Sequence, residues 1–304
     1  MKKVIIASAL AIVSLSGNAQ TKPVEKNGKY SFAFKGLYFE VDPAVGGRIS
    51  SFKLNGKEVL YTNKENGNNW GATFWPAPQS VWGWPPSDTL DSKPYTSKIV
   101  GNKLIVSSLP TKGKTNCAFE KTFETNEKDN SVSVTYKIKN TSKDTIALGS
   151  WQIARVPSGG LVYFPTGTTP ATGDLLPLLS NKNGVSWFDY DSSFIAKDPE
   201  AIPKLFSDGS QGWLAFASND AHLLLFKFTD TPADKKAPGE DEIELYTHHE
   251  NTYTELEPFG PFTKIAPNSA STWTVKWYVS KLPKTVVVKP GSKSLLEFTK
   301  NIMK

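Results

Sequence analysis

The residues with the clearest chemical potential lie in the pentapeptide Tyr253-Thr254-Glu255-Leu256-Glu257. Side chains alternate across a β-strand that rises ~3.3 Å per residue, so Glu255 and Glu257 would share one face about 6.6 Å apart, together with Tyr253. Like charges side by side destabilise a strand, and burial raises the pKa of a carboxyl group toward the range of a general acid or base. The pattern predicts two carboxylates for acid–base chemistry. The alternative is a solvated outer strand face without a function.

A second candidate region is the segment 69–88, NWGATFWPAPQSVWGWPPSD, in which four tryptophans and one phenylalanine fall within fifteen residues. Its prolines predict an ordered loop rather than a central strand. Indole rings stack on the C–H faces of sugars, and amides bind hydroxyl groups. We therefore expect Trp75, Gln79, Trp82 and Trp84 to bind carbohydrate. The alternative is that these rings close the end of the core.

Arginine occurs at only two positions, Arg48 and Arg155. Because a guanidinium offers a planar set of donors, both positions are candidates for a special role. Alternation on a strand would place Trp151, Ile153 and Arg155 on one face. We predict that Trp151 and Arg155 contact the substrate and that the guanidinium either holds a glutamate ionised or donates to sugar hydroxyls. A surface ion pair is the alternative.

The three histidines are His222, His248 and His249. Neighbouring strand residues point to opposite faces, so His248 and His249 with Glu250 make a weak metal site, and we predict neither a metal nor a cofactor. His248 is instead a candidate proton donor beside Glu255. The chain has no Gly-x-Ser-x-Gly elbow, P-loop or dinucleotide fingerprint, which excludes the corresponding serine hydrolases, nucleotidases and Rossmann enzymes.

The N-terminus of the 304-residue chain has two lysines after Met1, an apolar run over 4–15 and small residues before Gln20. This order is typical of a secretory signal peptide, and the run is too short to span a bilayer. We predict that residues 1–19 are removed and that the mature chain, 20–304, is periplasmic or secreted without membrane insertion. The net charge of +6 becomes +4 without the two leader lysines. Scattered lysines argue against a nucleic-acid partner.

Short β-prone runs separated by turn signals extend along most of the chain, and 22 glycines and 21 prolines accompany them. Long helical periodicity is absent. We predict a single all-β domain over 20–304, a large antiparallel β-sandwich whose concave face holds the ligand. The run 98–107 is predicted as one strand, 165–212 as long loops and 290–304 as a short helix. The lone cysteine, Cys117, is predicted to be buried.

Three segments together resemble the galactose mutarotase-like superfamily, which includes the aldose 1-epimerases. They are VGGRISSFKLNGKEVLY at 45–61, ELYTHHENTYTELEP at 244–258 and PFTKIAPNSASTWTVKWYV at 261–279. The resemblance implies a β-supersandwich. It also implies that Glu255 is the base that takes the proton of the anomeric hydroxyl, with Glu257 at a position similar to a family glutamine. The acid histidine of the family has no counterpart in the matching stretch, 140–155.

We therefore expect an exported, monomeric carbohydrate-binding protein that acts as an aldose 1-epimerase-like isomerase through Glu255. His248, Glu257 or Arg155 would assist at the ring oxygen. A non-catalytic glycan-binding module without the acid histidine is the alternative. A glycoside hydrolase is a third reading, because about 6.6 Å is at the low end of the carboxylate separation of inverting enzymes, but neighbours on one strand rarely flank a bond from opposite sides.

Overall fold

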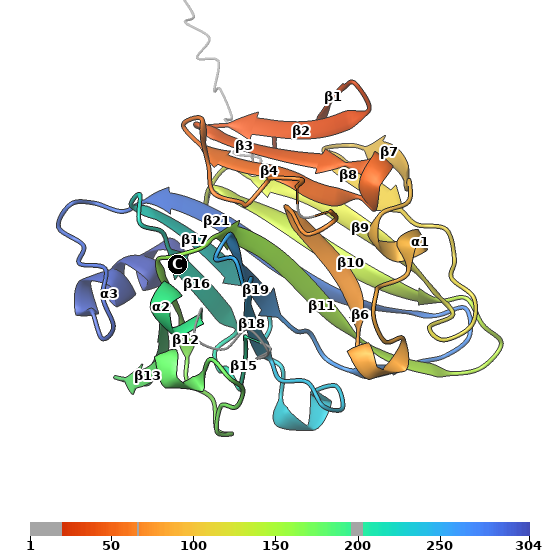
Figure 1. Ribbon diagram of the computed structural model, residues 1–304. Helices are drawn as coiled ribbons and strands as arrows, with labels where there is room; N and C mark the ends of the chain where they lie inside the picture. Colours follow the sequence, from red (N-terminus) through yellow and green to blue (C-terminus); the bar gives the residue numbers. More distant parts are fainter. Residues whose placement is uncertain (1–19, 66, 196–202) are drawn as a thin grey trace, which may run out of the picture.

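The computed structural model describes residues 20–65, 67–195 and 203–304, and the predicted signal peptide at 1–19 lies outside the described residues. Within these ranges the chain forms two large antiparallel sheets that pack face to face (Figure 1). This arrangement confirms the predicted all-β sandwich. None of the described helices has the length and apolar character needed to cross a membrane.

The first sheet has 11 strands, in the order β1-β2-β3-β4-β6-β11-β19-β18-β15, with β5 paired to β4 and β20 to β11. Its strands are β1 (Val24–Lys26), β2 (Lys29–Phe34), β3 (Leu37–Asp42), β4 (Arg48–Leu54), β5 (Lys57–Glu58), β6 (Ala72–Ala77), β11 (Ile146–Pro157), β15 (Lys204–Ser207), β18 (Ile243–Thr247), β19 (Tyr253–Pro258) and β20 (Thr263–Ile265).

The second sheet has 10 strands, in the order β13-β14-β12-β16-β17-β21-β10-β9-β8-β7. Its strands are β7 (Thr96–Val100), β8 (Lys103–Ser107), β9 (Cys117–Asn126), β10 (Ser131–Asn140), β12 (Leu161–Pro165), β13 (Leu179–Lys182), β14 (Val185–Asp189), β16 (Trp213–Ala217), β17 (His222–Lys227) and β21 (Ala270–Lys281). The helices are α1 (Asp88–Asp91), α2 (Ser192–Ile195) and α3 (Lys293–Ile302), with short 3-10 turns η1 (Pro43–Val45), η2 (Gln79–Val81), η3 (Leu176–Leu178) and η4 (Ala233–Lys235).

The main core fills the space between the two sheets. Phe39 and Phe52 of the first sheet meet the Trp277 ring of the second with centroids 6.0 and 5.9 Å apart. The buried amide of Gln152, on β11, accepts hydrogen bonds from the Tyr136 hydroxyl at 2.9 Å and the Trp277 indole at 3.1 Å. Because side chains alternate along β11, the residues on either side of Gln152 point to the outer face of the first sheet.

The outer face of the second sheet is closed by the C-terminal helix. Leu295 of α3 is fully buried in a cluster with Tyr163, Trp187 and Leu225, and Figure 1 shows α3 beside β16 and β17. The N-cap Ser292 accepts a hydrogen bond from the Leu295 amide at 3.2 Å, which satisfies one of the free donors at the helix start. The predicted short helix near the C-terminus is confirmed.

The prediction of a loop over 69–88 is wrong for its first part, since Ala72–Ala77 form the central strand β6. Proline is tolerated there because β6 pairs with β4 only at Ala72, while β11 continues alongside to Ala77. The side of β6 opposite β11 therefore has no neighbouring ladder for Pro76 to interrupt.

Two smaller predictions also need correction. The run 98–107 is a hairpin of β7 and β8 that turns at Gly101, whose φ of 61° favours glycine. The supposed loops of 165–212 contain strands, and Trp187 and Phe188 of β14 are buried in core clusters. Cys117 is buried as predicted, and burial raises the pKa of its thiol to about 11.

Candidate active site

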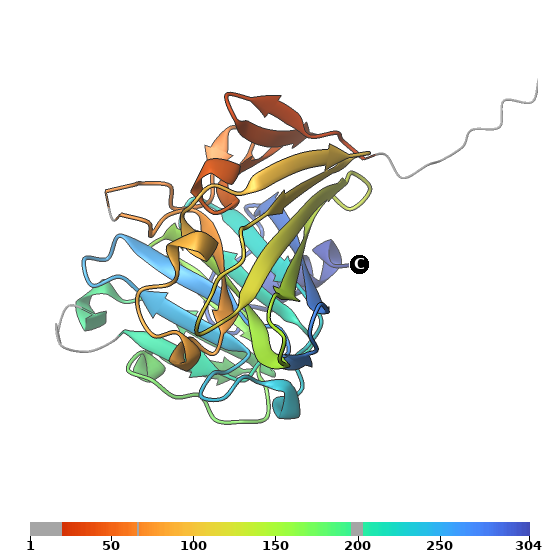
Figure 2. The ribbon, with the colours of Figure 1, turned by 90° about the vertical axis from the view of Figure 1, so that its right-hand side faces the viewer.

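A cavity of about 430 Å³ opens on the outer face of the first sheet. Its walls, which define the Glu255 cavity, are Asn69, Trp75, Gln79, Trp84, Trp151, Lys204, Tyr246, Tyr253, Glu255 and Glu257. Strands β6, β11, β15, β18 and β19 supply its floor, and in Figure 2 the orange segment after β6 lies beside the blue hairpin of β18 and β19. The volume is within the ~300–1,000 Å³ range of small-molecule sites.

Strand alternation and register bring the ionisable residues together. On β19, Tyr253, Glu255 and Glu257 line the cavity while Leu256 enters the core between the sheets. Glu255 is directly opposite Arg155 of β11 and Tyr246 of β18. Both outward-facing glutamates therefore lie on one cavity wall, as the alternation in the sequence predicts.

Glu255 is held by an ion pair with Arg155. Arg155 Nε lies 2.7 Å from Glu255 Oε1, and the guanidinium has no exposed surface. Nη1 donates to Thr73 Oγ1 at 3.3 Å and Nη2 to Asn69 Oδ1 at 3.5 Å. Arg155 thus lies behind Glu255, outside the cavity lining, and it is buried rather than part of a surface ion pair. This position suits a residue that orients the carboxylate.

Glu257 is in the opposite electrostatic situation. Its side chain is 1 % exposed, and burial, followed by the nearby charges of Glu244 and Glu255, raises the pKa of Glu257 well above its usual value. The Trp151 indole Nε1 donates to Glu257 Oε2 at 2.7 Å, whereas Oε1 has no hydrogen-bond partner among the described residues. A carboxyl group of raised pKa in the lining of a cavity is suited to act as a general acid.

Three further polar residues of the cavity lining, Asn69, Lys204 and Tyr246, were not predicted. Lys204 of β15 forms an ion pair with Glu244 of β18, and the glutamates around it raise the pKa of Lys204 to about 12 despite its burial. Burial and the charge of Glu255 raise the pKa of Tyr246 to about 12. Glu244 and Tyr246 alternate along β18 as Glu255 and Glu257 do along β19, and this pattern is the signal that could have revealed them.

Three tryptophans form the aromatic wall. The Trp75 and Trp151 rings meet edge to face with centroids 5.1 Å apart, and Trp84, which is 62 % exposed, lies 5.8 Å from Trp75. Trp75 Nε1 donates to Asp91 Oδ1 at 2.8 Å, and the other oxygen of Asp91 lies 3.4 Å from the buried guanidinium of Arg48. Both arginines of the chain therefore support this wall, because the Arg155 guanidinium is also 5.7 Å from the Trp75 ring centre.

Besides Arg155, two further residues predicted for the site, His248 and Trp82, are not in the lining of the Glu255 cavity. His248 follows the end of β18, stacks on the Tyr253 ring at 4.9 Å and shares a 3.0 Å hydrogen bond with Thr252 Oγ1. Burial lowers the pKa of His248. It is outside the Glu255 cavity and is therefore not placed to donate a proton there.

The described residues contain no cluster of three or more His, Cys, Asp or Glu arranged to hold a metal ion.

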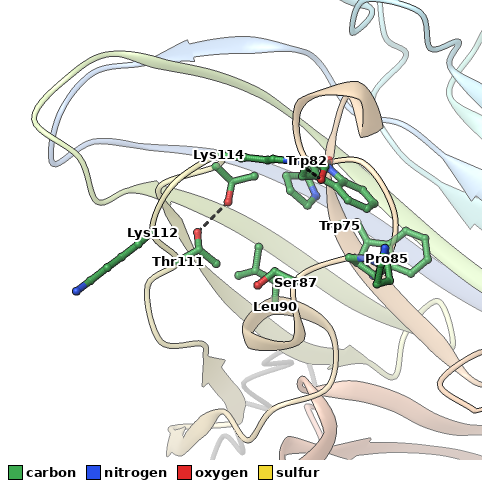
Figure 3. A pocket seen from close by; sticks show the side chains of 11 residues that line it. Trp75, Trp82, Pro85, Ser87, Leu90, Thr111, Lys112 and Lys114 are labelled. Atoms are coloured by element: carbon green, nitrogen blue, oxygen red, sulfur yellow. Dashed lines mark hydrogen bonds between the residues drawn. The ribbon is translucent and has the colours of Figure 1, made fainter.

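Trp82 lines a different cavity of about 210 Å³ on the other side of Trp75, which we call the Trp82 cavity (Figure 3). The turn η2 rotates the chain between Gln79 and Trp82, and the Trp82 indole then donates to the Pro76 carbonyl at 2.7 Å. Of the four residues predicted in this segment, Trp75, Gln79 and Trp84 line the Glu255 cavity and Trp82 does not.

Solved structures with the same fold include proteins described as a candidate aldose 1-epimerase and as galactose mutarotase-like. A candidate aldose 1-epimerase of Escherichia coli K12 has a TM-score of 0.59 at 12 % identity, over 84 % of this chain and 99 % of that one. A galactose mutarotase-like protein from Lactobacillus casei has a TM-score of 0.59 at 10 % identity, over 83 % and 100 %. One from Clostridium acetobutylicum has a TM-score of 0.55 at 11 % identity, over 84 % and 95 %. These likenesses confirm the predicted galactose mutarotase-like fold.

Sequence comparison adds a family assignment without a function. A search of the curated proteins finds no match. A family model described as "Domain of unknown function (DUF4380)" matches residues 62–280, a span that includes the strands of the Glu255 cavity from β6 to β19. This protein therefore belongs to the DUF4380 family.

Proposed function

We propose that this protein binds a carbohydrate in the Glu255 cavity and interconverts its anomers, as an aldose 1-epimerase-like isomerase. The observation that carries the proposal is the contrast between two carboxyl groups of one strand. Glu255 is ion-paired with Arg155, whereas burial raises the pKa of Glu257. Environments that separate two titratable groups in this way are typical of an acid and a base that act together.

In the proposed mechanism, Glu255 takes the proton from the anomeric hydroxyl of a cyclic sugar. The electron pair left on that oxygen forms the carbonyl of the open-chain aldehyde while the bond from the anomeric carbon to the ring oxygen breaks. Glu257 gives its proton to the ring oxygen. Rotation of the aldehyde followed by the reverse steps produces the other anomer and restores both carboxyl groups.

The surroundings of Glu257 support its role as the acid. After proton donation its carboxylate would accept a charge-assisted hydrogen bond from the Trp151 indole and would face the Lys204 ammonium, whose charge already favours an ionised Glu257. Glu257 would thus take the place, as proton donor, of the acid histidine of the mutarotases. From the N-terminal leader we further propose that the protein acts after export, in the periplasm or outside the cell.

The test is the rate of anomer interconversion, measured by exchange NMR on free hexoses and uronates with and without the protein. We expect acceleration over buffer, and a loss of about 10²–10⁴-fold in Glu255→Gln and in Glu257→Gln, the usual contribution of a general acid or base. Glu297→Gln, at an exposed position of α3, is the matched control. No acceleration for any sugar tested would contradict the isomerase.

A second candidate function is a glycan-binding module that performs no chemistry. It is favoured by the three indole rings that line the Glu255 cavity and by the absence of a histidine from that lining. Sugar binding in calorimetry that persists in Glu255→Gln, is lost in Trp75→Ala and occurs without any acceleration would favour the module over the isomerase.

A further inference from the structure

The Trp82 cavity adjoins the Glu255 cavity. Trp75 forms part of the wall of both, and the consecutive residues Trp84 and Pro85 line one cavity each. Trp84 is 62 % exposed, and burying large apolar surface of this kind is favourable for a bound ligand. A ligand that occupies both cavities would therefore pass over Trp75 and the exposed Trp84.

The lining of the Trp82 cavity suits a neutral ring with an apolar face. The Trp82 N–H is already bonded to Pro76, and Lys114 donates to the Trp82 carbonyl at 3.1 Å. Thr111 and Thr115 hydrogen-bond to each other at 2.8 Å, and Figure 3 shows the Lys112 side chain directed away from the cavity. The groups left facing the cavity are the indole ring, proline rings and Leu90, which match the C–H face of a sugar.

We infer that the Trp82 cavity binds the second unit of an oligosaccharide whose reducing-end unit occupies the Glu255 cavity. The inference rests on the proposed function and narrows its ligand class from free monosaccharides to short saccharides. At about 210 Å³, below the range usual for drug-sized ligands, the cavity is sized for a single ring. The exposed hydroxyl of Ser87, which does not cap α1, lies at the rim where ring hydroxyls would emerge.

The test compares affinities of the full chain for D-glucose and D-galactose with those for di- and trisaccharides that carry the same sugars at the reducing end, by calorimetry. We expect the disaccharides to bind at least about tenfold more tightly, which corresponds to ~1.4 kcal/mol. Ser87→Trp, which fills the Trp82 cavity from an exposed position, should remove this gain and leave monosaccharide binding unchanged. Ser97→Trp, at an exposed position of β7 outside both cavities, is the matched control.

The results separate the two proposals. Equal affinity for mono- and disaccharides, or a disaccharide gain that survives both Ser87→Trp and Trp82→Ala, would overturn the second subsite and leave the Glu255 cavity as a monosaccharide site. Absence of binding for every saccharide tested would contradict the proposed function, and the subsite with it. A gain lost in Ser87→Trp but kept in Ser97→Trp would support the subsite.

Discussion

The outer faces of the two sheets carry different chemistry. On the second sheet, the helix α3 buries Leu295 against Tyr163, Trp187 and Leu225. On the first sheet, Lys204, Glu255 and Glu257 line an open cavity, and Arg155 and Glu244 form ion pairs with two of these residues. Burial of apolar side chains stabilises a fold, whereas burial of charges carries a desolvation cost that their pairing barely offsets.

The buried charges of the first sheet indicate where a functional site lies in this fold. A helix would have closed the first sheet with less electrostatic cost, as it does for the second. Fully buried Glu257, with a raised pKa and an oxygen left without a partner among the described residues, has no stabilising role that its contacts explain. Such a combination in a cavity is what we expect of the binding or catalytic site that we propose.

The strongest test of this comparison replaces the buried ion pair. Arg155→Met alone should lower the free energy of unfolding by about 3–5 kcal/mol, because it leaves the Glu255 carboxylate without its partner. The double variant Arg155→Met/Glu255→Leu should recover most of that loss, since similar-sized apolar residues often replace buried pairs at no cost. Urea unfolding measures both, and the sugar activity should be absent from both.

If the double variant has the same free energy of unfolding as Arg155→Met, the Arg155–Glu255 pair is needed for the fold. The polar face of the first sheet would then stabilise the protein as the apolar face of the second does, which contradicts the comparison. Glu255→Leu alone completes the cycle and yields the coupling energy of the pair. We expect it to be destabilising as well, because it leaves the guanidinium of Arg155 buried and unpaired.

A smaller effect should follow from the apolar face. Leu295→Ala removes a fully buried side chain beneath α3 and should cost about 2–5 kcal/mol of unfolding free energy in urea. Sugar binding in the Glu255 cavity should be unchanged, because α3 packs on the other sheet. Lys300→Ala, at an exposed position of the same helix, should alter neither quantity. A loss of sugar affinity in Leu295→Ala would show that the two faces are coupled.

Local alternation explains which parts of the site the sequence could predict. Glu255 and Glu257 are two residues apart, so a single strand puts both on one wall whatever its neighbours are. Trp151 and Arg155 follow the same rule on β11, where the predicted strand over 150–155 is confirmed. The overall sandwich was predictable for a similar reason, because short β-prone runs with turn residues between them are a local signal.

The remaining parts depend on contacts between distant segments. Lys204 enters the site because β15 pairs with β18, which places it opposite Tyr246, and no local pattern around Lys204 contains this pairing. Strand β6 was missed because Pro76 is disfavoured in a central strand unless the neighbour on one side ends early, as β4 does. His248 was misplaced because the turn after β18 puts it on the Tyr253 ring.

The smallest effect that we predict concerns the alkaline limb of the activity profile. Glu257 donates a proton only in its neutral form, so activity should fall as the pH rises through its pKa in the folded protein. The Trp151 indole lowers that pKa by hydrogen bonding to the carboxylate, and Trp151→Phe should therefore raise it. A hydrogen bond to a charged group is worth about 1 kcal/mol more than one to a neutral group, so the limb should move up by just under one pH unit.

Phenylalanine at this position keeps a ring to stack on Phe259, which lies 5.0 Å from Trp151, while it removes the donor to Glu257. The linked stability effect has a defined sign. The pKa of Glu257 is raised in the folded protein. Between the ordinary glutamate pKa and this raised pKa, the folded protein therefore binds more protons than the unfolded chain. The free energy of unfolding falls as the pH rises through this interval. Trp151→Phe should extend this fall to higher pH.

An alkaline limb of the activity profile that stays in place, or moves to lower pH, would assign the proton donor to a group other than Glu257. Lys204 and Tyr246 would then be the next cavity residues to substitute.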